Sequence, residues 1–155
     1  MGGGTQKELG IILLQHLAKY IIFYYKTMSG NVLIIDNTSS AKTNSSLLDE
    51  YGYSVDLVPN QEIGLQKLRG QTHDVVIVQE PTESKSWQLC ENIRRMTSIP
   101  IIVISTNASI ETSVKAIRAG ADYFIRKPFG PLEFLGRIQS LLRRSQQTNI
   151  SPVIS

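Results

Sequence analysis

The stretch "HDVVIVQEP", residues 73–81, predicts a buried strand that ends on a polar side chain. Four apolar residues follow Asp74, which are too few for a helix and too uniformly apolar for a strand with one face in water. Such strands are typical of the centre of a parallel sheet, and open α/β folds bind ligands at the carboxyl ends of their strands. The side chain placed there is Gln79, a neutral amide that is neither a nucleophile nor an acid.

Comparable strand and helix patterns repeat on both sides of this strand. The expected strands are residues 31–36, 53–58, 74–79, 99–105 and 122–127, and the expected helices are residues 39–52, 60–70, 85–96, 109–120 and 131–144. Strands and helices that alternate in this way predict an α/β fold, with a parallel sheet, right-handed crossovers and helices on both faces.

Length and composition set mild limits on function. A chain of 155 residues fits one domain, and its net charge of +3 without a run of like charges gives no reason to expect direct nucleic acid binding. The single cysteine, Cys90, excludes an internal disulfide, and its helical spacing from Leu89 and Ile93 predicts a packing residue. Because the sequence shows no cleavable secretory signal, a cytoplasmic location is expected.

The segment before the first strand differs from the rest of the chain. Residues 8–25 are mostly apolar, but Gln15, His16 and Lys19 interrupt them, so a membrane span is not expected. A helical pattern joins Ile11, Leu14, Ala18, Ile21 and Tyr25. We therefore expect a leader with an amphipathic helix in residues 1–28, which could dock on the domain, form a dimer or lie on a membrane surface. The main domain is expected in residues 29–145, and the polar residues 146–155 are expected to be a linker or a disordered tail.

The stretch "AGADYFIRKPF", residues 119–129, carries a resemblance to a known family. It resembles the receiver (response-regulator) domains of two-component signalling, which have a Gly-Ala-Asp turn, an aromatic residue three positions before a lysine, and a Lys-Pro-Phe sequence. The resemblance extends from Asn31 to about Arg144. It implies a flavodoxin-like (CheY-like) parallel sheet of five strands in the order 2-1-3-4-5, flanked by five helices, to which the N-terminal helix is an addition. It also implies a cis peptide bond between Lys127 and Pro128.

The chemistry of that family depends on five positions. Two acids after the first strand help to hold Mg²⁺, an aspartate at the end of the third strand accepts a phosphoryl group, and a hydroxyl and a lysine bind the phosphoryl oxygens. The matching positions in this sequence are Asp36, Asn37, Gln79, Ser105 and Lys127. The second acid and the phosphoacceptor are therefore replaced by amides.

These replacements predict an atypical, phosphorylation-independent receiver without a metal or cofactor. A carboxamide is far less nucleophilic than a carboxylate and cannot form an acyl phosphate, and Mg²⁺ prefers anionic oxygens. We expect Asp36 and Lys127 to form a salt bridge across the pocket, which the Gln79 amide could join. Phe124, at the family's switching aromatic position, is expected to be fixed in the core.

The resemblance also implies a surface for protein partners, formed by helix 109–120, strand 122–127 and helix 131–144. The long last helix resembles the OmpR-type subfamily, whose dimers pair charges across this surface. Glu133 and Arg137 occupy two of the expected charged positions, whereas Ser113, Arg118 and Tyr123 do not carry the usual charges. Ile117 and Tyr123 could instead give a more apolar surface for a kinase, a regulator or a second receiver, including a homodimer.

Two classes of function stay open. The first is a non-enzymatic signalling module that acts by protein–protein interaction, alone or as the regulatory part of a transcription regulator. The alternative is a small flavodoxin-like enzyme or cofactor-binding protein. Residues 36–45, "DNTSSAKTNS", offer hydroxyls but no glycine for a phosphate-binding loop, so a helix cap explains the hydroxyl cluster better.

Overall fold

The computed structural model describes residues 3–27, 30–80, 86–106 and 109–148, and it contains a five-stranded parallel sheet. The strands are β1 (Asn31–Ile35), β2 (Ser54–Val58), β3 (Val75–Glu80), β4 (Ile101–Ser105) and β5 (Tyr123–Arg126). Their spatial order is β2-β1-β3-β4-β5, and every neighbouring pair is parallel. The predicted fold class and strand order are therefore confirmed.

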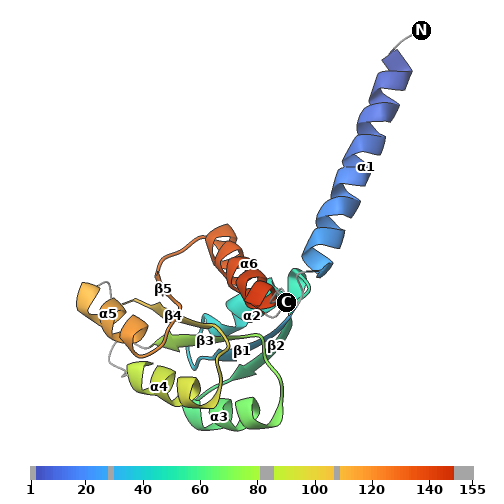
Figure 1. Ribbon diagram of the computed structural model, residues 1–155. Coiled ribbons are helices and arrows are strands. Elements are labelled where there is room, and N and C mark those ends of the chain that lie inside the picture. The colour runs from blue at the N-terminus through green and yellow to red at the C-terminus, as the bar shows by residue number, and fades with distance from the viewer. Residues whose placement is uncertain (1–2, 28–29, 81–85, 107–108, 149–155) are drawn as a thin grey trace, which may run out of the picture.

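Helices cover both faces of this sheet (Figure 1). They are α1 (Gly3–Thr27), α2 (Ala41–Glu50), α3 (Gln61–Gly70), α4 (Ser86–Met96), α5 (Ile110–Arg118) and α6 (Pro131–Thr148). Helices α2 and α6 lie on one face, while α3, α4 and α5 lie on the other. Helix α6 continues past residue 144, where the predicted helix ends, so the predicted tail of residues 146–155 begins as helix. Residues 149–155 lie outside the described residues.

The alternation of side chains along the strands builds two separate cores. In β3, Val75 and Ile77 pack with α2 and α6, whereas Val76 and Val78 pack with α3, α4 and α5. Both cores are almost completely closed to solvent, which explains why the central strands are apolar on both faces. Cys90 has no exposed surface and belongs to the second core, which confirms its predicted packing role.

Two glycines meet specific steric demands of this packing. Gly120 has a φ of 114° at the turn between α5 and β5, a conformation that other residues rarely adopt. Gly64 faces the sheet from α3, where an added Cβ would lie 2.5 Å from Cδ1 of Ile35. The α3 helix therefore lies too close to β1 for a larger side chain at this position.

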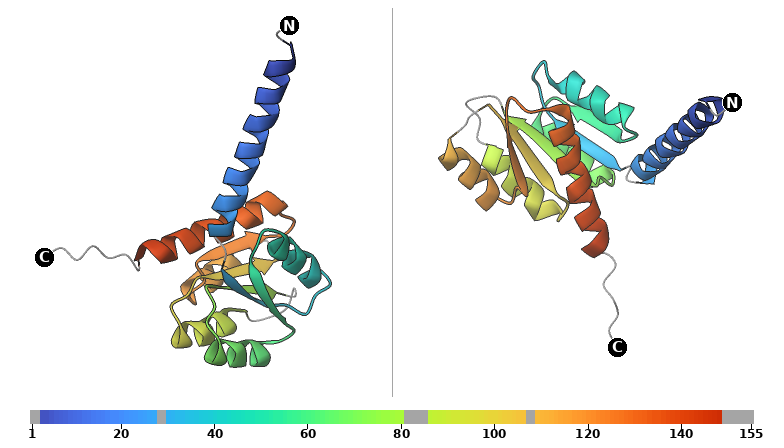
Figure 2. Two further views of the ribbon diagram at one scale, coloured as in Figure 1. Left: turned by 90° about the vertical axis from the view of Figure 1, so that its right-hand side faces the viewer. Right: turned by 90° about the horizontal axis from the view of Figure 1, so that it is seen from above.

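Helix α1 projects away from the α/β domain instead of packing on it (Figure 2). From Leu9 to Ile21 its large apolar side chains are exposed, with values that include 67% for Leu14 and 42% for Ile21. The expectation that this helix could dock on the domain is therefore wrong for the described residues. Among the described helices, none is long and apolar enough to cross a membrane.

Candidate functional site

The side chain of Gln79 lies at the carboxyl edge of the sheet, one residue before the end of the central strand β3. Strand alternation turns it to the same face as Ile77, toward α2, and its exposed surface is only 4%. Asp36 follows β1 and Lys127 follows β5, so the topology brings both charged residues to the same edge. The loop before α2 adds Thr38 and Ser40.

The orientation of the Gln79 amide follows from the charges around it. The Asp36 carboxylate can only accept a hydrogen bond in its ionised form, and the Lys127 ammonium can only donate one. The amide nitrogen therefore faces Oδ2 of Asp36, at 2.7 Å. The amide oxygen accepts from Lys127 Nζ and from the Ser40 and Thr38 hydroxyls, at 2.5 Å for Ser40 Oγ and 2.9 Å for Thr38 Oγ1.

Protein groups occupy both oxygens of the Asp36 carboxylate. Oδ1 accepts from the Thr38 backbone N–H at 2.7 Å, and Oδ2 accepts from the Gln79 amide. Asp36 is 5% exposed, so these hydrogen bonds replace most of the hydration that a carboxylate has in water. Both carboxylate oxygens of Asp36 are therefore used in hydrogen bonds within the chain.

Lys127 reaches the same network from the opposite side. Its Nζ donates to Ser40 Oγ at 2.8 Å and also to the Gln79 amide oxygen. The predicted direct salt bridge is therefore wrong: among the described residues, no ion pair joins Asp36 to Lys127. The Gln79 side chain is long enough to stand between them, and its amide bonds to each charge in turn.

Sequence reasoning missed three members of this network: Thr38, Ser40 and the buried Asn44 of α2. The Asn44 amide lies 3.2 Å from that of Gln79. Ser40 stands at the N-cap of α2, but within the described chain its hydroxyl caps no backbone N–H. The expectation that the hydroxyl cluster is a helix cap is therefore wrong for Ser40. The available signal was a run of small polar residues directly after an apolar strand.

The other predicted site residues differ in their exposure and packing. Asn37 is exposed, whereas Ser105 is completely buried and its backbone oxygen accepts from the Lys127 N–H at 3.0 Å. Phe124 is half-buried and packs against the core on the α3, α4 and α5 face. The predicted cis bond between Lys127 and Pro128 is confirmed.

The residues of this edge do not fit the Mg²⁺ that receivers use. Asp36 supplies a carboxylate whose oxygens already accept hydrogen bonds, and Asn37 and Gln79 are neutral amides. Mg²⁺ needs an octahedral set of hard oxygens, in which one or two free carboxylates accompany its bound waters. Within the described residues, no group of three histidine, cysteine, aspartate or glutamate side chains could hold a metal ion.

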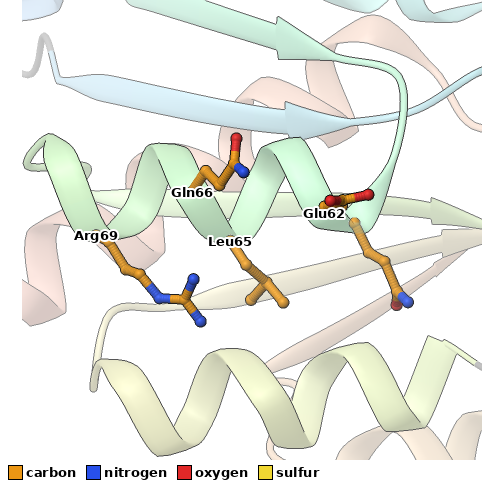
Figure 3. A pocket seen from close by; sticks show the side chains of 5 residues that line it. Glu62, Leu65, Gln66 and Arg69 are labelled. Atoms are coloured by element: carbon orange, nitrogen blue, oxygen red, sulfur yellow. The ribbon is translucent and has the colours of Figure 1, made fainter.

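A surface hollow along α3 offers little chemistry (Figure 3). Its lining consists of Gln61, Glu62, Leu65, Gln66 and Arg69, which all come from this one helix. Four of these residues are exposed and Leu65 is half-buried. The hollow contains none of the residues of the Gln79 network, so we do not assign it a function.

A second feature is the surface formed by α5, β5 and α6, which we call the α5–β5–α6 face. Ile110, Val114 and Ile117 form an exposed apolar stripe along α5, with exposures of 78%, 40% and 46%. On the same face, Arg137 of α6 donates to the Tyr123 hydroxyl at 3.2 Å, and its guanidinium lies 4.8 Å from the centre of the Tyr123 ring.

A sequence profile of the response regulator receiver domain matches residues 32–139. The chain belongs to this receiver domain family. Its fold is shared with solved receivers, including a two-component response regulator from Clostridium difficile, with a TM-score of 0.70 and 26% identity over 74% of this chain and 97% of that one. A CheY-like receiver from Methanospirillum hungatei gives a TM-score of 0.71 and 25% identity over 76% of this chain and 97% of that one.

Curated relatives of this receiver are longer proteins. The response regulator ArlR of Staphylococcus saprophyticus is 29% identical over 79% of this chain and 56% of its own length. A probable transcriptional regulator, ycf27 of Cyanidium caldarium, is 32% identical over 77% of this chain and 49% of its own. The chain thus spans about half the length of the curated relatives it matches.

Proposed function

We propose that this receiver acts in signal transduction through protein–protein interaction without being phosphorylated. The observation that carries the proposal is the Gln79 amide, which stands one residue before the end of β3 and bonds to both Asp36 and Lys127. A carboxamide cannot attack phosphorus to give the acyl phosphate of an active receiver. The amide also engages the two charged groups that such chemistry would use.

The hydrogen bonds among Asp36, Gln79 and Lys127 also support the view that protein side chains permanently fill the phosphorylation pocket. Asp36 and Gln79 are each at most 5% exposed, and Lys127 is half-buried. A phosphoryl group and Mg²⁺ would have to break the hydrogen bonds of Asp36 and Lys127 without gaining a nucleophile in return. We therefore infer that the receiver keeps one state of this pocket.

The α5–β5–α6 face is the proposed binding surface. It combines the apolar stripe of Ile110, Val114 and Ile117 with the charged positions Glu133 and Arg137. The partner would be a kinase, a regulator or a second receiver, in the cytoplasm, and the chain could form the regulatory part of a longer transcription regulator, as its relatives' names suggest.

An enzymatic or cofactor-binding role has weaker support. A flavodoxin-like phosphate loop needs free hydroxyl or N–H donors after the first strand. The hydroxyls of Thr38 and Ser40 contact the Gln79 amide instead, and the Thr38 N–H donates to Asp36. These groups are therefore already engaged within the chain.

Intact-mass measurement tests phosphorylation independence. The protein is incubated with acetyl phosphate and Mg²⁺ beside a receiver that retains the aspartate, and its mass is expected to stay unchanged while that of the control rises by one phosphoryl group. A gain in mass would contradict the proposal. If the same gain persisted in Gln79→Leu, the acceptor would be a different residue.

Site-specific photocrosslinking in cells tests the binding surface. A photocrosslinking amino acid in place of Ile117 or Glu133 should give the same defined adduct, because both residues are exposed on one face. The control position is Ile63, which is 36% exposed on α3, on another side of the domain. Equal adduct formation from all three positions would refute a specific surface.

A further inference from the structure

Helix α1 presents an unusual amount of apolar surface to water. Its large apolar residues from Leu9 to Ile21 are between 42% and 68% exposed: Leu9, Ile11, Ile12, Leu13, Leu14, Leu17, Tyr20 and Ile21. Together they expose on the order of 800 Å², whereas monomeric proteins rarely expose continuous apolar patches above a few hundred Å². The helix projects away from the domain, so the domain does not cover this surface (Figure 1).

The spacing of these residues is that of an interhelical seam. Ile11, Leu14, Ala18 and Ile21 follow alternating steps of three and four residues, as do the a and d positions of a coiled coil. A second seam, which contains Leu13, Leu17 and Tyr20, lies directly beside the first. With 25 residues, α1 is about 37 Å long, which is enough for three heptads.

Between Glu8 and Ile21 the polar residues of α1 gather on one side of the helix. Glu8, Gln15 and Lys19 are spaced by seven and four residues and form one stripe, which Ile12 interrupts and beside which His16 lies. This stripe carries both signs of charge, so it lacks the uniformly basic face by which amphipathic helices bind anionic lipid. A helix that is apolar around most of its surface, with only a narrow polar stripe, buries that surface against other elements.

We propose that α1 is a self-association element that packs against α1 of a second copy of this chain. Each partner in a protein interface of standard size buries about 800 Å² of total surface, which is of the same order as the apolar surface that α1 leaves exposed around most of its circumference. The seam of Leu14 and Ile21 forms the centre of this contact. The proposal concerns a surface separate from the Gln79 network and from the α5–β5–α6 face, so it does not depend on the proposed function.

Sedimentation equilibrium of the full chain tests this proposal. The unaltered chain is expected to have at least twice the monomer mass at micromolar concentration. Replacing Leu14→Glu together with Ile21→Glu should raise the dissociation constant at least about a hundredfold, because it places like charges in an apolar contact. The matched control is Gln15→Glu with Lys19→Gln, which changes the net charge equally but on the polar stripe, and it should stay associated.

Circular dichroism separates this effect from unfolding. Both double variants should keep the thermal transition of the α/β domain, since the altered side chains of α1 are exposed.

A monomeric full chain, or an equal loss of association in both variants, would overturn the proposal. Association that Ile117→Glu abolishes would assign it to the α5–β5–α6 face instead. A chain that is monomeric in buffer but floats with phosphatidylserine vesicles would assign α1 to a membrane surface.

Discussion

Replacing Gln79 with leucine tests the central network most directly. Leucine has a similar volume and keeps the end of β3 apolar, but it removes the amide that bonds to Asp36 at 2.7 Å and to Lys127. Asp36 would keep only its hydrogen bond from the Thr38 N–H, although it is 5% exposed. The substitution therefore leaves a buried carboxylate with half of its present partners.

The expected loss of stability can be worked out from these contacts. Hydrogen bonds to charged groups contribute about 1.5 to 3 kcal/mol each. The loss at Lys127 is smaller, because this side chain is half-buried, keeps its bond to Ser40 and can turn toward water. The added apolar burial of leucine offsets about 1 kcal/mol. We expect Gln79→Leu to lower the free energy of unfolding by about 2 to 3 kcal/mol and the melting temperature by roughly 6 to 12 °C.

Urea denaturation followed by the fluorescence of Trp87 measures this change. The control is Gln66→Leu, the same chemical change at an exposed position of α3, which should alter stability by no more than about 0.5 kcal/mol. A double-mutant cycle with Lys127→Met should give a coupling energy of about 1 kcal/mol. A loss below about 0.5 kcal/mol for Gln79→Leu, or no coupling to Lys127, would refute the network as a stabilising feature.

Three other predictions concern the packing of the domain. Gly64→Ala should lower the free energy of unfolding by about 1 to 3 kcal/mol, since its Cβ would lie 2.5 and 2.8 Å from two carbons of Ile35. Gly136→Ala in α6, where an added Cβ meets no described atom within 4 Å, should raise the free energy of unfolding by up to about 1 kcal/mol. Urea denaturation that shows Gly64→Ala to be the more stable variant of the two would contradict both predictions. Cys90 has no exposed surface, so Ellman's reagent should label it only after unfolding, and rapid labelling of the native protein would show that the core opens.

The sequence alone determined the fold and the identity of the residue at its central edge. The apolar pattern is a local property: the run after Asp74 is short and rich in β-branched residues, which favours a buried strand over a helix. Its repetition with intervening helices restricts the topology, because parallel strands need right-handed crossovers. The same count along the strand placed Gln79 as its last residue, whereas β3 continues for one more residue, to Glu80.

Only the tertiary structure decided how the side chains at that edge combine. Ser40 and Lys127 are 87 positions apart, and their hydrogen bond depends on how the loop before α2 and the residue after β5 come together at the carboxyl edge of the sheet. A serine before a helix can use its hydroxyl to cap that helix or to bond to another side chain, and the two choices differ little in local free energy. The position of Ser40 in the sequence therefore could not predict its contact with Gln79. The predicted salt bridge between Asp36 and Lys127 was wrong for the same reason. Only the folded chain shows that the Gln79 amide lies between the two charged groups. The direction of α1 is another such case, because apolar spacing shows that a helix needs a partner but not which surface supplies it.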